Sequence, residues 1–170
     1  MTASPPSSPT DGFSRPSTRF FTITDSRFFI GTVALLNSIR LTGHVGEFVV
    51  LDRGLTEDQR ELLAPHAVLF ELPDEIEDPY LVKPFPALAP FDGIVVLVDS
   101  DIVVTDSLEP ILAAASTGKI CVFPDPPGDY WRWFPEWRDI FELTAPLRRE
   151  PYMNAGLPCQ IADDPAALAP

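Results

Sequence analysis

The chain has 170 residues, 45% of them hydrophobic, which is enough for one domain with a substantial core. Its formal net charge of −13 excludes the basic surface that nucleic acid binding requires, and it excludes electrostatic attachment to anionic lipid. No apolar stretch reaches the roughly 18 residues of a membrane span, and no secretory signal is visible. Two cysteines are too few for a disulfide framework, so the default prediction is a cytoplasmic protein.

The first part of the chain alternates predicted strands and helices. Residues 1–18 are rich in Ser, Thr and Pro and predict a disordered tail. The β-branched and aromatic runs that predict strands cover residues 19–24, 47–52 and 67–72. Apolar residues at helical spacing predict a helix over 28–41. Thr56, with Gln59 three residues later, forms a capping-box pattern that begins a second helix.

The second part continues the same alternation around one strongly apolar strand, residues 94–99. The other predicted elements are a helix over 107–115, a strand over 119–123, a helix over 137–143 and an extended segment over 152–157. Residues 73–92 and 158–170 are expected to be irregular. Alternating strands and helices predict an α/β fold with a mostly parallel sheet flanked by helices.

The apolar strand ends in two acids, Asp99 and Asp101. Burying bare carboxylates there would cost many kcal/mol unless a charge compensates them, and a divalent cation at the carboxyl end of the strand would do so. In an extended strand these side chains lie about 7 Å apart, so both reach one ion only if the backbone bends at Ser100. The alternative is a strand-to-turn junction where Asp accepts from backbone N–H groups. The cation hypothesis predicts a hard divalent cation together with a diphosphate.

The order of these elements and three motifs resemble the nucleotide-sugar glycosyltransferases of the GT-A fold, nearest to the retaining glycosyltransferase family 8. The motifs are Thr22–Asp25 at the end of the first strand, the DxD motif within Leu97–Asp101, and an Asn-Ala-Gly segment within Tyr152–Leu157. The resemblance covers residues 19–157 and implies a Rossmann-like GT-A domain that binds a nucleotide sugar. It also implies truncation at the C-terminus, because the family supplies a further metal-binding His there and both histidines here precede the DxD motif.

The activity that the resemblance implies is a hexosyl- or glycosyltransferase that moves a sugar from a UDP-type donor to an acceptor the sequence does not identify. The metal would be Mn²⁺ or Mg²⁺, held by Asp99 and Asp101. The residues expected to contact the donor are Thr24, Asp25, Lys83, Asp99, Ser100, Asp125, Asn154 and Gly156. No nucleophile or base is assigned.

Several of these residues have a simpler structural alternative. Asp25 is suited to cap the helix that follows it. Lys83 could be a solvated loop charge, and Asp125 could belong to a Pro-rich turn. Asn154 and Gly156 could form a turn pair, although a glycine also lets the backbone approach a ligand closely. The sequence leaves these alternatives open.

Two other functions compete with sugar transfer. A phosphohydrolase of the haloacid dehalogenase type also places Asp-x-Asp after an apolar strand and would use Asp99 as the phosphoryl acceptor. In that class, however, this strand comes first, and here it is the fourth. A nucleotide-binding domain without catalysis is the other alternative.

Overall fold

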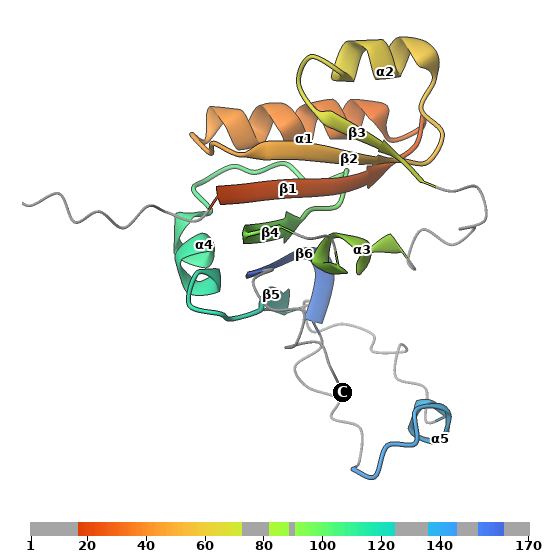
Figure 1. The fold of residues 1–170 in the computed structure, drawn as a ribbon, viewed down its shortest axis with the longest axis vertical. Coiled ribbons are helices and arrows are strands. Elements are labelled where there is room, and N and C mark those ends of the chain that lie inside the picture. The colour runs from red at the N-terminus through yellow and green to blue at the C-terminus, as the bar shows by residue number, and fades with distance from the viewer. Residues whose placement is uncertain (1–16, 73–81, 89–90, 125–135, 146–152, 162–170) are drawn as a thin grey trace, which may run out of the picture.

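The computed structural model describes residues 17–72, 82–88, 91–124, 136–145 and 153–161. Within these ranges six strands form one sheet, in the order β3-β2-β1-β4-β6-β5 (Figure 1). The strands are β1 Ser17–Thr24, β2 Glu47–Asp52, β3 Val68–Glu71, β4 Gly93–Leu97, β5 Cys121–Pro124 and β6 Met153–Ile161. The helices are α1 Phe29–Leu41, α2 Glu57–Leu63, α3 Phe85–Leu88, α4 Glu109–Ala115 and α5 Trp137–Ile140.

The sheet is mostly parallel, which confirms the predicted α/β class. β1 pairs in parallel with β2 and β4, and β2 pairs in parallel with β3. β6 is antiparallel to both of its neighbours, β4 and β5. Every residue of β4 is buried, because the strand is central and both of its faces are covered.

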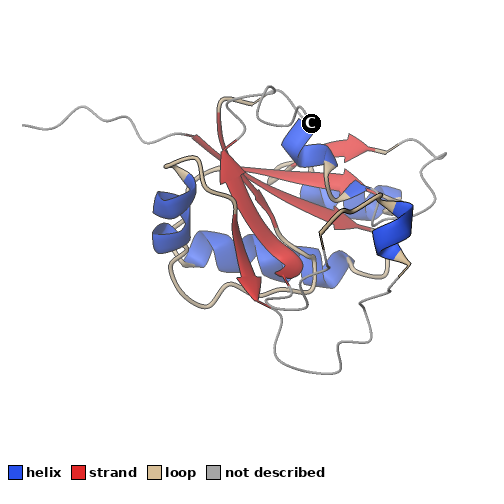
Figure 2. Cartoon of the chain, turned by 90° about the horizontal axis from the view of Figure 1, so that it is seen from below, coloured by secondary structure: helices blue, strands red, loops and turns tan. Residues whose placement is uncertain are grey.

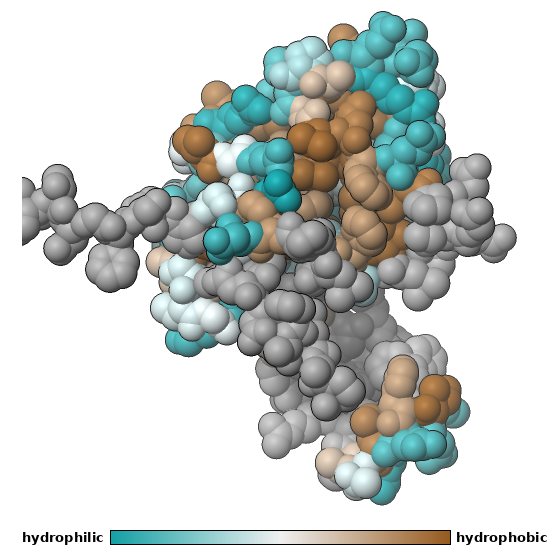
Figure 3. Space-filling view, viewed as in Figure 1, coloured by the Kyte–Doolittle hydropathy of each residue, from teal (hydrophilic) through white to brown (hydrophobic). Residues whose placement is uncertain are grey.

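Side chains alternate between the two faces of the sheet and build a core on each. Figure 2 shows that helices lie on both sides of the sheet. On one face, Phe20, Val50 and Val96 pack with buried residues of α1, α2 and α4. On the other face, Phe21 and Val95 pack against Val82 and the partly buried side chain of Phe85 in α3. Figure 3 shows apolar side chains gathered over β1 to β3, bordered by the hydrophilic side chains of α2.

The first and last strands, β1 and β6, each extend beyond their predicted bounds. β1 begins at Ser17, inside the predicted tail, because Ser17 pairs with Gly93 and its hydroxyl donates to the carbonyl of Asp92. β6 continues to Ile161, although residues from 158 onward were expected to be irregular. Pro158 lies in the stretch where the pairing between β5 and β6 is irregular, and a missing N–H is tolerated there.

The segment 73–92 was expected to be irregular, and its described part contains the short helix α3. The helix predicted over 137–143 is limited to Trp137–Ile140. Among the described residues, no helix combines the length and apolar character needed to cross a membrane.

Candidate functional site

The strand order reverses between β1 and β4. From β1 the chain builds outward through β2 to β3, and then returns to place β4 on the other side of β1. In open α/β sheets, ligands bind at such a reversal, beyond the carboxyl ends of the two strands. β1 ends at Thr24 and β4 at Leu97, so the segments that follow these two strands meet at this edge.

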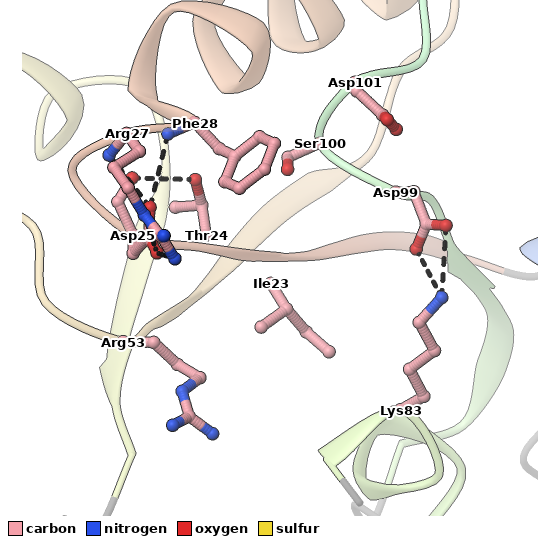
Figure 4. A pocket seen from close by; sticks show the side chains of 10 residues that line it. All are labelled: Ile23, Thr24, Asp25, Arg27, Phe28, Arg53, Lys83, Asp99, Ser100 and Asp101. Carbon is pink, nitrogen blue, oxygen red and sulfur yellow. Dashed lines mark hydrogen bonds and ion pairs between the residues drawn. The ribbon is translucent and has the colours of Figure 1, made fainter. Parts of the chain in front are cut away.

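A cavity of about 510 Å³ lies at this edge (Figure 4). The residues that line it are Ile23, Thr24, Asp25, Arg27, Phe28, Arg53, Lys83, Asp99, Ser100 and Asp101. Both acids of the DxD motif and four of the other residues expected to contact the donor are therefore in one place. Asp125 lies outside the described residues.

The backbone turns directly after β4, as the sequence requires if both acids are to face one site. The N–H of Ile102 donates to the carbonyl of Asp99 at 3.1 Å, which closes a turn over Ser100 and Asp101. Ser100 is buried and Asp101 is exposed. Figure 4 shows that the two carboxylates point in different directions, with that of Asp99 facing Lys83.

Asp99 has two neighbours that the sequence placed in the site. Lys83 Nζ lies 2.8 Å from one Asp99 oxygen and 3.1 Å from the other. The backbone N–H of Asp99 donates to the carbonyl of Gly156 at 2.8 Å. Asn154 Oδ1 in turn accepts from the N–H of Gly156 at 2.6 Å. The Asn-Ala-Gly segment of β6 therefore lies directly against Asp99, although it is more than 50 positions further along the chain.

Asp25 has the helix-supporting role that the sequence allowed, and it also lines the cavity, where its contact with a donor stays a prediction. One carboxylate oxygen accepts from the backbone N–H groups of Arg27 at 2.8 Å and Phe28 at 3.3 Å, just before α1 begins. The other accepts from the Arg27 guanidinium at 2.6 Å, and this hydrogen bond is the main cause of a lowered pKa at Asp25. Asp25 thus supports the start of α1 and lines the cavity with an ionised carboxylate.

Thr24 is buried, and its hydroxyl accepts a hydrogen bond from the Thr32 hydroxyl at 2.8 Å. It also lies 3.3 Å from the carbonyl of Asp25, to which it can donate. The Thr24 hydroxyl therefore joins β1 to α1, and contact with a donor would have to use what remains of its bonding capacity.

Four cavity residues were not selected from the sequence: Ile23, Arg27, Phe28 and Arg53. Arg27 and Phe28 follow Asp25 closely, and that proximity was the available signal. Arg53 reaches the site because its N–H donates to the carbonyl of Thr24 at 2.8 Å, which joins the turn after β2 to the end of β1. With Lys83, the cavity thus holds three cationic side chains, a set suited to a polyanion such as a diphosphate.

The donor set fits a hard divalent cation that shares its coordination with a ligand. Among the described residues, no three His, Cys, Asp or Glu side chains lie close enough to hold a metal by themselves. Mg²⁺ and similar ions are commonly bound by one or two carboxylates together with substrate phosphates. Asp99 and Asp101 supply two such carboxylates beside the three cationic side chains.

Comparison with known proteins gives similarity of structure only. No protein-family model and no curated protein sequence matches the chain. The galactosyltransferase LgtC, solved with donor and acceptor sugar analogs, superposes with a TM-score of 0.61 at 16% identity, over 85% of this chain and 58% of that chain. The glycosyltransferase GlyE of Streptococcus pneumoniae TIGR4 superposes with a TM-score of 0.56 at 13% identity, over 88% of this chain and 35% of that chain.

A third similar structure is glucosyl-3-phosphoglycerate synthase from Mycobacterium tuberculosis, solved with Mn²⁺ and UDP. It gives a TM-score of 0.50 at 18% identity, over 86% of this chain and 57% of that chain. These similarities confirm the predicted glycosyltransferase fold of the GT-A type, whereas membership of family 8 stays a prediction. The chain spans less than two thirds of the length of each of these three proteins.

Proposed function

We propose that this chain binds a nucleotide-sugar donor of the UDP type, with a divalent cation, and transfers the sugar to an acceptor. The observation that carries the proposal is the cavity at the β1–β4 reversal, which joins Asp99 and Asp101 to three cationic side chains in a glycosyltransferase fold. The Mn²⁺ and UDP bound to the mycobacterial synthase support this choice of metal and nucleotide.

In this proposal Asp99 and Asp101 hold Mn²⁺ or Mg²⁺. A cation bound there supplies positive charge that stabilises the departing diphosphate. Lys83 balances the Asp99 charge before the donor binds and then faces the phosphates, together with Arg27 and Arg53. The other donor contacts are assigned to Thr24, Asp25, Ser100, Asp125, Asn154 and Gly156.

Calorimetry of UDP binding with and without Mn²⁺ tests the proposal. We expect Mn²⁺ to raise UDP affinity by about 10-fold or more, and Asp101→Asn to abolish that gain, because one carboxylate ligand is lost. Asp139→Asn, an exposed acid of α5, removes the same charge far along the chain and should behave as the parent protein does. Equal UDP affinity with and without Mn²⁺ in the parent protein would refute metal-dependent donor binding.

A second candidate is a nucleotide-binding domain without turnover. The ion pair between Lys83 and Asp99 favours it, because an ammonium group already balances that carboxylate. The candidates separate on turnover, since release of UDP from a UDP-sugar above the rate without protein excludes binding alone. The phosphohydrolase alternative receives no support from the fold similarities, and a beryllofluoride adduct at Asp99 would be needed to revive it.

A further inference from the structure

The segment that carries the acid pair runs along α1 and contacts it or its flanking turn at three successive points. Ser100 lies against Gly31, in the first turn of the helix. The N–H of Val104 donates to the Ser38 hydroxyl at 3.0 Å, and that of Leu108 donates to His44 Nε2 at 2.8 Å. Residues 100–108 therefore follow α1 in the same direction, from its beginning to just past its end.

The first of these contacts leaves no room for a side chain. A Cβ on Gly31 would lie 2.4 Å from the carbonyl oxygen of Ser100 and 3.3 Å from its carbonyl carbon. The obstacle is backbone, so it cannot rotate away as the end of a side chain could. Any other residue at position 31 would push the Asp99–Asp101 turn away from α1, or α1 away from the sheet.

A second glycine, Gly156 in β6, also lies close to the turn that carries the acids. A Cβ on Gly156 would lie 2.8 Å from Asn154 Oδ1 and 3.2 Å from an oxygen of Asp99. The acid-bearing turn is thus bounded by Gly31 on one side and by Gly156 on another. α1 also follows directly on Asp25 and Phe28, which line the far wall of the cavity.

We infer that Gly31 and Gly156 are positioning residues, which set the Asp99 and Asp101 carboxylates relative to the wall that begins α1. The inference rests on the proposed function, because it assigns a consequence to the carboxylates' position. Displacement of a binding group by about 1 Å can cost two orders of magnitude in a reaction that depends on it. A single added methyl group should therefore weaken the use of Mn²⁺ far more than it weakens the nucleotide contacts.

The test is Gly31→Ala, with Gly46→Ala as a matched control. A Cβ on Gly46 would lie 2.5 Å from the carbonyl oxygen of Thr18, an equally close approach to backbone at the opposite end of the sheet. For each variant, UDP affinity is measured with and without Mn²⁺, together with the melting temperature. Loss of stability alone lowers both affinities by the same factor, whereas a displaced acid pair lowers the affinity measured with Mn²⁺ far more than the affinity measured without it.

We expect Gly31→Ala to reduce the gain that Mn²⁺ gives to UDP affinity by about 10-fold or more, and Gly46→Ala to leave it within about twofold. If Gly31→Ala keeps the full gain, the inference is wrong while the proposed function stands. If the parent protein has no gain, the proposed function fails. Should Gly31→Ala not fold, Gly156→Ala decides. Its added Cβ meets side-chain atoms, so the variant should fold, and one of them is the Asp99 carboxylate, which must move. An unchanged gain in that variant overturns the inference.

Discussion

Asp52 is a buried carboxylate at the end of β2, with an exposed fraction of 3%. One oxygen accepts from the N–H groups of Gly54 and Leu55, each at 2.8 Å, and the other from Arg60 Nε at 2.6 Å. Burial by itself would raise the pKa of Asp52, but the hydrogen bonds from Arg60, Leu55 and Gly54 and the Arg60 charge outweigh it and lower the pKa. Asp52 therefore stabilises the fold in its ionised form.

The lowered pKa of Asp52 fixes the direction in which the free energy of unfolding depends on pH. The contribution of Asp52 is fully present above its unfolded pKa, near 3.8, and is lost as the pH falls through the lower folded value. Asp52→Asn keeps an oxygen for the two backbone donors but loses the ion pair, so we expect a loss of about 1.5–3 kcal/mol in the free energy of unfolding at pH 7. The difference from the parent protein should shrink below pH 3.8.

Urea unfolding at neutral and acid pH measures this difference. The control is Glu47→Gln, which breaks the partly exposed pair with Arg19 and should cost less than about 1 kcal/mol at any pH. A difference for Asp52→Asn that stays constant down to the acid limit would contradict the role assigned to the ion pair.

At the scale of single residues, the sequence predicts features that depend on neighbouring positions in the chain. The DxD pair could be recognised because an apolar strand and two acids are adjacent in the chain. Lys83 was selected for the donor phosphate. Its contact with Asp99 could not be foreseen, because it depends on how residues 82–88 pack against the sheet. The close approach of Gly31 to Ser100 is likewise a tertiary contact. The sign of it in the sequence is a glycine inside a helical pattern.

At the scale of elements, local patterns again succeeded where long-range contacts did not. The capping box was predicted from Thr56 and Gln59 three residues apart, and both of its hydrogen bonds are present. The end of β6 was predicted too early, because the strand is extended by pairing with β4 and β5, which are distant in the chain. The path of residues 100–108 along α1 is set by contacts between residues more than 60 positions apart, which no local pattern encodes.

Ser38 tests how much that path depends on α1. Its buried hydroxyl accepts from the N–H of Val104 at 3.0 Å and donates to the carbonyl of Leu35 at 2.8 Å. Ser38→Ala leaves the Val104 N–H buried without its partner, so we expect a loss of about 1–3 kcal/mol in the free energy of unfolding. The slightly better helix propensity of Ala offsets only a small part.

Ser116→Ala is the matched control in chemical denaturation. Its hydroxyl is exposed and donates to the carbonyl of Ala113 within the same helical turn. Removing it should change the free energy of unfolding by less than about 0.5 kcal/mol. Equal losses in the two variants would mean that the bond between Ser38 and Val104 contributes nothing specific to the attachment of the segment to α1.

At the scale of the whole molecule, the net negative charge of the chain contrasts with the cationic side chains that line the cavity. The chain carries 25 acidic and 12 basic residues, yet three of its cationic side chains line one cavity. A net charge of −13 attracts divalent cations and repels a free nucleotide diphosphate over distances of the order of the Debye length. Local cations beside the acid pair are therefore a way to bind a polyanion on an acidic protein, and a metal that enters with the diphosphate reduces the repulsion further.

This opposition predicts a salt dependence that differs between ligands. Raising the ionic strength from about 0.01 M to about 0.15 M shortens the Debye length from about 30 Å to about 8 Å and screens the overall charge. We expect Mn²⁺ alone to bind more weakly as salt rises. The preformed complex of UDP with Mn²⁺ should show a shallower dependence, because its net charge is smaller in magnitude than that of Mn²⁺. Calorimetry in choline chloride and in NaCl measures both slopes and separates screening from competition by Na⁺. A Mn²⁺ affinity that does not respond to salt would mean that the overall charge has no part in recruiting the cation, and that the acid pair acts through its immediate neighbours alone.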